Sequence, residues 1–306
     1  MERRDLRSFQ TRAVKQIARI GHFFWRAAMR FSEDGGLANS SNVALSLLLS
    51  LFPFLMLIAS LIRQLGDPAL VDEVVDLLLG HWPANTSAPI AEQVKIIVEQ
   101  NPGEFYSLST LIALVLASNG IENARDGLNR AYKVRETRSW ILRRLQGIVF
   151  VVLVAFSVIA VAFVLVGTPF LWRYLVATVP VLAEFSVSVS LTRYGISIAV
   201  LGLALYAFHY FLPAGRRDFH SLIFGIVFTI LGILIGSELF AIYLRTIANY
   251  TALYAGLAGL MIAIVYLYGV SIMILFGAEV NNALGEYRAS LDRDAIEDGP
   301  GSDQMR

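Results

Sequence analysis

Glu238 is the residue whose position most directly suggests chemistry, because it is a carboxylic acid inside the apolar run 221–244. If the run is helical, Glu238 lies about 9 Å from its end, at about 1.5 Å per residue. Acids at such membrane depth commonly face a cavity, pair with a cation or carry protons. Arg245, two turns later on the same face, is an alternative partner that would make Glu238 half of a structural ion pair. The sequence leaves both interpretations open.

A second set of polar residues lies at helical spacing at and just after the end of the apolar run 106–121: Asn119, Glu122, Asn123 and Asp126. If this stretch is helical, these side chains share one face. They are candidates for a polar vestibule that receives a charged headgroup or ion. The alternative is a cap and ion-pair network that anchors the helix to the next loop, which is slightly favoured because charges cost little at a wet boundary. Glu279 and Asn281, at the end of the last apolar run, allow the same two interpretations.

Motifs for hydrolysis or nucleotide chemistry are absent from the sequence. The chain has no cysteine, and its four histidines are scattered (His22, His81, His209 and His220). Neither a short-spaced set of metal ligands, a Walker A loop nor a GxSxG nucleophile motif occurs. We therefore predict no metal, no cofactor and no enzymatic activity. An unfamiliar membrane enzyme acting on a lipid headgroup is the less favoured alternative.

The elements that must position these residues are membrane helices. Hydrophobic residues make up 56% of the 306-residue chain, charged residues only 16%, and the mean hydropathy is +0.62. A span of the bilayer needs about 20 apolar residues. The runs that approach this length are 44–62, 106–121, 148–166, 194–212, 221–244 and 255–280. The sequence thus predicts an all-α, polytopic membrane protein of about six transmembrane helices, the first kinked at Pro53.

The distribution of charge predicts the orientation. Arginine and lysine dominate the segment before the first run and the loop 125–144, whereas acids dominate 63–105. Because basic residues stay on the cytoplasmic side, both termini and the loop 125–144 are expected there. The formal net charge of +1 argues against a nucleic-acid partner, which requires concentrated positive charge.

Three segments flank or interrupt the membrane domain 32–284. Residues 1–31 alternate basic and apolar side chains, which predicts a basic amphipathic helix on anionic lipid headgroups; a helix packed under the bundle is the alternative. Residues 63–105 contain two short amphipathic stretches, 71–79 and 88–98, which predict a small helical cap on the outer face. The polar tail 285–306 is expected to be disordered.

Three stretches resemble a known family. They are SLFPFLMLIASL (50–61), ASNGIENARDGLNRAYKVRETRSWILRRL (117–145), and YFLPAGRRDFHSLIFG (210–225) with YTALYAGLAGLMIAIVYLYGVSIMILFGAEVNNAL (250–284). Together they are similar to the YihY/BrkB family of bacterial inner-membrane proteins, over about residues 19–288. The resemblance implies a six-helix bundle in the bacterial inner membrane with cytoplasmic termini, so the cap predicted from the sequence of residues 63–105 would be periplasmic. Members have carried the label ribonuclease BN, which no residue pattern here supports.

The sequence and the resemblance favour a protein that binds or transports an amphiphilic, lipid-like or small polar substrate across the bilayer. Membrane lipids are the expected partners, and a homo-oligomer fits as well. The alternative is a non-transporting envelope scaffold or regulator of lipid or cell-wall assembly. A polar cavity that converges on Glu238 would favour transport, whereas a solid bundle with a large apolar side would favour the scaffold.

Overall fold

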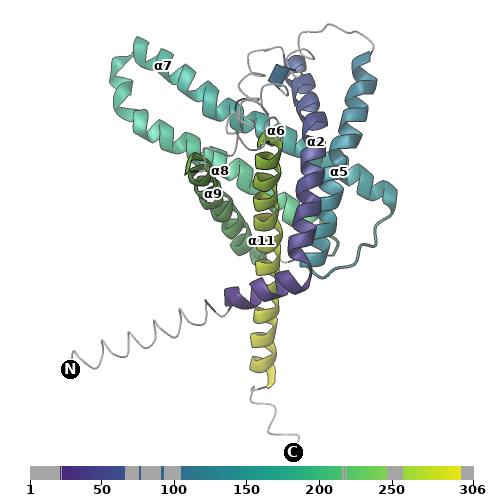
Figure 1. Cartoon of the computed structure of the whole chain (residues 1–306). Helices are drawn as coiled ribbons and strands as arrows, with labels where there is room; N and C mark the ends of the chain where they lie inside the picture. Colours follow the sequence, from purple (N-terminus) through teal and green to yellow (C-terminus); the bar gives the residue numbers. More distant parts are fainter. Residues whose placement is uncertain are drawn as a thin grey trace, which may run out of the picture.

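The computed structural model describes residues 21, 23–65, 76, 91–92, 105–215, 217, 219–246 and 258–297, and every regular element in them is helical (Figure 1). The α-helices are α2 (Gly36–Leu65), α5 (Phe105–Ala131), α6 (Trp140–Ala162), α7 (Thr168–Thr178), α8 (Ser186–Phe211), α9 (Ile223–Thr246) and α11 (Ala258–Glu297). Short elements between them are the π-helix η1 (Phe163–Gly167) and the 3-10 helices η2 (Pro180–Phe185) and η3 (Phe219–Ser221). The expected all-α fold is confirmed.

The long helices pack in chain order around a closed bundle. α2 packs against α5, α5 against α6, α6 against α8, α8 against α9, α9 against α11, and α11 returns to α2. The α2–α5 contact is the most extensive, and it contains a hydrogen bond from the Gly120 amide to the Ser50 hydroxyl at 3.1 Å. Because lipid provides little hydrophobic drive between helices, such polar and close-packed contacts hold a membrane bundle together.

Four helical segments are long and apolar enough to cross a membrane: Trp140–Leu165, Pro180–Phe211, Phe219–Leu244 and Leu260–Glu286. α2 and α5 are 30 and 27 residues long, so either is long enough for a bilayer core of about 30 Å. They do not meet the same criterion of length and apolarity within the described residues. The chain is therefore a helical multi-pass membrane protein, and the count of six spans stays a prediction.

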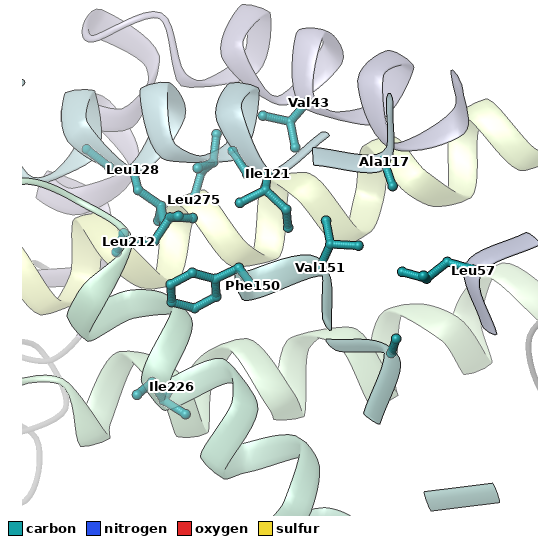
Figure 2. Packing of buried hydrophobic residues seen from close by; sticks show 14 of the residues in the cluster. Val43, Leu57, Ala117, Ile121, Leu128, Phe150, Val151, Leu212, Ile226 and Leu275 are labelled. Carbon is teal, nitrogen blue, oxygen red and sulfur yellow. The ribbon is translucent and has the colours of Figure 1, made fainter. Parts of the chain in front are cut away.

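The buried apolar core lies where α2, α5, α6 and α11 meet (Figure 2). Leu128 and Leu275 are almost completely buried, as are Phe150 and Val151 of α6. Large apolar side chains on the outer surfaces of α8 and α9 are exposed instead, including Val187, Leu203 and Leu239. A bundle with apolar residues both inside and outside is what a lipid solvent requires.

Helix α6 begins at a capped residue and continues far beyond the predicted span. Ser139 is the N-cap, and its hydroxyl accepts a hydrogen bond from the Leu142 amide at 3.4 Å. The helix then passes through the π-turn η1 into α7, so residues 140–178 are helical without a break. The segment that we expected to be an outward loop, 167–193, is thus mostly helical and places Arg193 within α8.

Residues 23–33 form a helix that lies across the lower end of the bundle in Figure 1, before the turn at Asp34 and Gly35. Its Phe24 ring contacts Phe228 of α9 at 5.4 Å between centroids, and Phe31 meets Phe276 of α11 edge-on at 5.6 Å. Trp25 on its other side is 65% exposed. The described part of the predicted N-terminal helix is therefore packed against the bundle on one side, and its contact with lipid headgroups stays a prediction.

Residues 285–306 were predicted as a disordered tail, and residues 63–105 as an outer cap. The predicted disorder of residues 285–306 is wrong for 285–297, where α11 continues as a helix to Glu297, and residues 298–306 lie outside the described residues. Helix-compatible residues such as Glu286, Arg288, Leu291 and Arg293 extend the apolar span without an intervening proline. The predicted outer cap, with its stretches 71–79 and 88–98, lies almost entirely outside the described residues.

Candidate functional site

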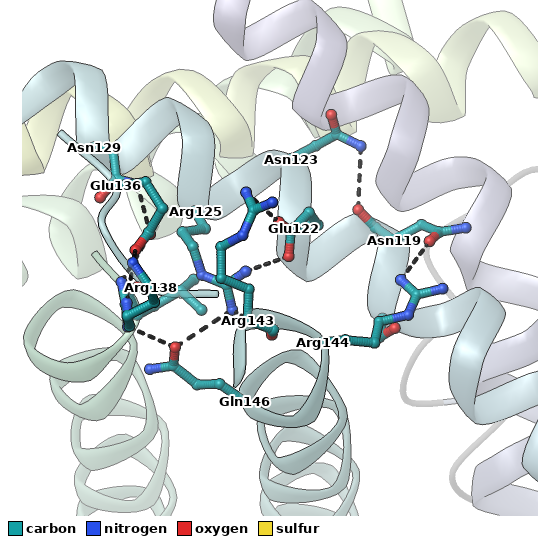
Figure 3. Close-up of polar contacts among 12 residues, drawn as sticks. Asn119, Glu122, Asn123, Arg125, Asn129, Glu136, Arg138, Arg143, Arg144 and Gln146 are labelled. Atoms are coloured by element: carbon teal, nitrogen blue, oxygen red, sulfur yellow. Dashed lines mark hydrogen bonds and ion pairs between the residues drawn. The ribbon is translucent and has the colours of Figure 1, made fainter. Parts of the chain in front are cut away.

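The first candidate cluster lies at what we call the polar end of the bundle, where residues 119–146 meet the last turn of α8 and residues 277–286 of α11. Its centre is Arg125, which is completely buried (Figure 3). Arg125 pairs with Glu122 and donates to the Arg143 carbonyl at 3.0 Å. Glu122 also pairs with Arg143 at 3.1 Å, and Arg144 donates to the Asn119 side chain at 2.8 Å.

Three of these contacts join the C-terminal half of α5 to the start of α6: Arg125 with the Arg143 carbonyl, Glu122 with Arg143, and Asn119 with Arg144. The Asn123 side chain donates a hydrogen bond to the Asn119 carbonyl within the same helix at 3.1 Å, and Asp126 is exposed. A buried arginine left without its acid would carry an uncompensated charge, which costs several kcal/mol. The contacts fit the anchoring interpretation of Asn119, Glu122, Asn123 and Asp126, while a role in an ion or substrate pathway stays a prediction.

A second part of the network fixes the turn after α5 to the end of α8. Arg138 pairs with Glu136 at 2.8 Å and donates to the Leu212 carbonyl at 2.8 Å. Partial burial alone would raise the pKa of Glu136, but the hydrogen bonds from Arg138 and Asn129 outweigh it and lower the pKa to about 2. Asn129 also accepts the Ala214 amide at 2.7 Å. The 212–217 segment is therefore held by side chains from α5 and its turn.

A third part of the network is buried around Tyr132. The Tyr132 hydroxyl contacts His209 Nδ1 at 3.0 Å and accepts from Asn281 Nδ2 at 3.3 Å. The Arg217 guanidinium lies 4.1 Å from the centroid of the Tyr132 ring. Burial raises the pKa of Tyr132 to about 12, so the phenol is neutral over the physiological range. Tyr132 thus joins α5, α8, α11 and the 212–217 segment through neutral contacts and one cation–π contact.

Asn281 also fixes the place where α9 crosses α11. Its side-chain oxygen accepts the Gly225 amide at 2.7 Å, and Thr229 donates to the Gly225 and Met273 carbonyls at 2.8 and 3.2 Å. A Cβ atom on Gly277 would overlap Thr229 and lie 2.8 Å from the Gly225 carbonyl oxygen. The two helices therefore touch backbone to backbone, and neither Gly225 nor Gly277 can gain a side chain without separating them.

Beyond this crossing the same two helices enclose an apolar pocket of about 260 Å³. Its lining includes Gly232, Gly236 and Phe240 from α9 and Val265 and Met273 from α11. The polar groups of the lining are hydroxyls: Ser237 lies 3.2 Å from the Tyr266 oxygen, and Tyr268 also lines the pocket. The volume is just below the range of about 300–1,000 Å³ that is usual for ligand sites. The arrangement can receive an apolar chain.

Gly232 and Gly236 lie one helical turn apart on α9, a spacing at which small residues can bring membrane helices together, but the two glycines differ. A Cβ on Gly232 would lie 2.6 Å from Met273 Sδ, so Gly232 does allow a close contact. A Cβ on Gly236 would meet no atom within 4 Å, because Gly236 faces the pocket.

Glu238 is exposed on α9, among the exposed side chains of Leu234, Ile235, Leu239 and Ile242. It follows pocket residue Ser237 and lies 13 residues, or about 20 Å along the helix, from Gly225. The structure therefore does not bring Glu238 together with the polar end. The side chain of Arg245 lies outside the described residues, so the proposed ion pair between Glu238 and Arg245 stays a prediction.

The remaining predicted residues lie on α2 and α11. Helix α2 continues through Pro53, and beside it a second apolar pocket of about 180 Å³ is lined by residues such as Ser50, Phe54 and Val151. The predicted kink at Pro53 stays a prediction. Glu279 is 1% exposed, and neither of its carboxylate oxygens has a hydrogen-bond partner in the described structure.

Sequence reasoning missed several buried or half-buried polar residues. Tyr132, His209, Arg217 and Thr229 were not selected, although His209 interrupts the apolar stretch ALYAFHYFL and so could have been noticed. Among the described residues, no group of three or more His, Cys, Asp and Glu side chains is placed to hold a metal ion. The expectation of a protein without enzymatic activity stays a prediction.

These observations define a class: a multi-pass helical membrane protein with a cross-braced polar end and an apolar pocket between two of its helices. The model of the family "Virulence factor BrkB" matches residues 27–301. The chain therefore belongs to the BrkB family, as its motifs suggested.

Curated relatives agree with this assignment. The chain is 29% identical over 255 residues to "Putative ribonuclease-like protein YfkH" of Bacillus subtilis, covering 83% of this chain and 92% of that protein. It is 26% identical over 295 residues to a "UPF0761 membrane protein" of Alteromonas mediterranea, covering 94% of both chains. A "UPF0761 membrane protein" of Alkalilimnicola ehrlichii is 26% identical over 299 residues, covering 91% of this chain and 61% of that protein. No solved structure matches the chain.

Proposed function

We propose that the protein binds an amphiphilic, lipid-like molecule between α9 and α11 and moves it across the bacterial inner membrane. The observation that carries the proposal is the apolar pocket of about 260 Å³, which the two helices enclose beyond their crossing. Val265, which lines the pocket, is 49% exposed, so an acyl chain can enter from the side of the bundle. Such a molecule is already dissolved in the bilayer, and only its headgroup has to pass the hydrocarbon core.

Polar groups beside the pocket support an amphiphile over a purely apolar ligand. Ser237, Tyr266 and Tyr268 bring hydroxyls to the lining, and Glu238 follows on the exposed side of α9. Hydroxyls hydrogen-bond to ester or phosphate oxygens without adding charge to the membrane interior. The carboxylate of Glu238 is costly at this depth without a polar partner, and a headgroup amine or sugar would satisfy it.

The experiment is photocrosslinking with a phospholipid that carries a diazirine on its acyl chain, followed by mapping of the labelled peptides. We expect labelling to concentrate on the 265–273 part of α11. Gly236→Leu should fill the pocket and reduce this labelling at least about tenfold, since no atom opposes the new side chain. Gly195→Leu is the matched control, because Gly195 is also exposed, on α8, with no atom within 4 Å of a Cβ.

Translocation is measured with the same variants in proteoliposomes, from the accessibility of a headgroup-labelled lipid to an impermeant quencher. Loss of flux in Gly236→Leu with normal flux in Gly195→Leu supports transport through this pocket. Uniform labelling over the outer helix surfaces, unchanged by Gly236→Leu, would remove the pocket as a binding site. Pocket labelling without translocation would leave a lipid-binding scaffold as the function.

A further inference from the structure

Glu279 is a buried acid that takes no part in the hydrogen bonds and ion pairs of the polar end. Its residue is 1% exposed, and both carboxylate oxygens lack hydrogen-bond partners in the described structure. A cavity of about 10 Å³ adjoins it, lined also by Phe31, Asp34, Gly36 and Asn39. Such a volume holds at most about one water molecule. Glu279 therefore adjoins a small space between α11, α5 and the start of α2.

The charged groups around the cavity come from three elements and are already paired with one another. Arg30 pairs with Glu286 at 2.6 Å, Lys133 pairs with Asp34 at 3.3 Å, and Arg130 donates to the Asn39 side-chain oxygen at 2.9 Å. None of these three cations contacts Glu279. An ionised carboxylate buried without a partner costs several kcal/mol, whereas a protonated one does not. The three nearby cations act in the opposite direction and favour ionisation.

A proton suits this site better than a metal ion does. A metal cation needs several oxygen ligands, but the oxygen of Asn39 is taken by Arg130, whose side chain also lines the cavity. A bound cation would lie close to that guanidinium. A proton needs neither a ligand shell nor additional volume. The side chain of Asp34 is 38% exposed and lines the same cavity, so it connects Glu279 to the outside.

The cavity is covered by the segment that holds the N-terminal helix. Phe31 is 7% exposed and lines the cavity, and a Cβ on Gly36 would overlap its ring. Arg30 and Asp34, on either side of Phe31, make the ion pairs that tie residues 30–34 to Glu286 and Lys133. Ionised Glu279 competes with Glu286 and Asp34 for these cations, and it needs more hydration than the cavity, with room for at most about one water molecule, can provide.

We propose that Glu279 binds one exchangeable proton, and that its protonation holds residues 23–36 against α11 while its ionisation releases them. At low pH the carboxyl is neutral, so Arg30 and Lys133 stay with Glu286 and Asp34. At high pH the buried charge draws in water and the neighbouring cations, and the covering segment moves. The proposal does not depend on the lipid pocket, which lies on the other side of the α9–α11 crossing.

The test uses spin labels, which the cysteine-free chain makes simple. Labels at Trp25→Cys and Phe219→Cys, both on exposed residues, report the distance between the N-terminal helix and the bundle. We expect one narrow distance distribution at about pH 5 and a broader, longer one at about pH 9. Glu279→Gln keeps the size but cannot ionise, so it should give the narrow distribution at both values. Glu238→Gln is the matched control and should keep the full pH response.

A second measurement reads the proton directly. The infrared difference spectrum between the two pH values should contain the carbonyl band of a protonated carboxylic acid, and Glu279→Gln should remove that band. A pH response that survives in Glu279→Gln but disappears in Asp34→Asn would assign the proton to Asp34 and overturn the proposal. A distance that changes with sodium concentration at constant pH would also overturn it, in favour of a cation site. A wild-type distance that is constant with pH has the same consequence.

Discussion

The two halves of the α9–α11 pair are built differently. At the polar end, Gly225 and Gly277 bring the helix backbones into contact, and Thr229 and Asn281 bond across the crossing. Beyond Gly232 the helices separate around the pocket, where a Cβ on Gly236 would meet nothing. Small residues therefore serve two purposes along one helix. They allow the helix backbones to touch at one end, and they leave space for a ligand at the other.

The two halves therefore differ in how strongly they contribute to the stability of the bundle. The polar end is tied together by buried contacts that reach α5, α8 and the 212–217 segment, so a change there affects the whole bundle. The pocket half has few polar contacts, and its outer residues are exposed. Local opening is easiest where buried contacts are few. Substitutions at the polar end should therefore lower stability, and substitutions in the pocket half should alter function at little cost in stability.

The largest expected effect is that of Gly277→Ala. The new methyl group would overlap Thr229 and press on the Gly225 carbonyl oxygen, which is backbone and cannot rotate away. Overpacking of this kind costs about 1–3 kcal/mol, and here we expect the upper half of that range. Thermal unfolding in detergent micelles measures the effect. The control is Gly236→Ala, which should change stability by less than about 0.5 kcal/mol. Equal losses in both variants would contradict the division between the two halves.

A smaller loss is expected for Asn281→Leu. The substitution leaves the buried Gly225 amide without an acceptor, whereas the Tyr132 hydroxyl loses the Asn281 donor but keeps its contact with His209. A buried polar group without a partner costs about 1–3 kcal/mol. The counterpart in the pocket half is Ser237→Ala, which removes the contact with Tyr266 and should cost less than about 1 kcal/mol. A more damaging Ser237→Ala would show that the pocket half is also held by its polar contacts.

The sequence predicted the helical membrane class, because long apolar runs have few other solutions in lipid. The run 221–244 coincides closely with α9, whereas helices with polar ends were longer than expected, such as α5 and α11. Hydropathy marks the apolar part of a helix and not its hydrogen-bonded end. Residues after Ile121 and after Val280 therefore had no apolar signal, although they continue as helix.

The candidate sites were harder to predict, because they depend on which helices are neighbours. The spacing of Asn119 and Glu122 on α5 was visible, but their partners Arg144 and Arg143 on α6 were not. The pocket is formed mostly by glycine and aliphatic residues, whose types are ordinary in any membrane helix. The sequence showed that Glu238 is unusual. It did not show that Glu238 lies away from the polar end, where most of the other predicted residues lie.

A third prediction concerns acid stability at the polar end. The pKa of Glu136 is lowered in the folded state to about 2 from its usual value of 4.5. Its ion pair therefore stabilises the fold above the unfolded pKa, and this contribution is lost as the pH falls from about 4.5 toward about 2. Glu136→Gln should be less stable than the wild type at neutral pH and should lose less on acidification. Glu33→Gln, on an exposed residue, should follow the wild-type curve. Parallel curves for Glu136→Gln and the wild type would exclude Glu136 as a source of the acid sensitivity.

The smallest expected effect is at Lys133, which ends α5 in the left-handed conformation with φ 54°. The Val134 amide bonds to the Asn129 carbonyl and the Lys133 amide to the Arg130 carbonyl, each at 2.9 Å, which is the Schellman pattern that usually has glycine at this place. The left-handed conformation of Lys133 destabilises the fold by about 1 kcal/mol. Its half-exposed ion pair with Asp34 at 3.3 Å stabilises the fold by at most about the same amount.

Lys133→Gly should therefore change stability by less than about 1 kcal/mol. Glycine adopts the left-handed conformation without strain, and this gain offsets the lost ion pair. Lys133→Ala loses the pair and keeps the strained conformation, so it should be less stable than Lys133→Gly by about 1 kcal/mol. Thermal unfolding of the three proteins in the same detergent measures both differences. If Lys133→Gly is destabilised as much as Lys133→Ala, the ion pair with Asp34 outweighs the strain. The turn after α5 would then depend on its charges as strongly as the α9–α11 crossing depends on its glycines.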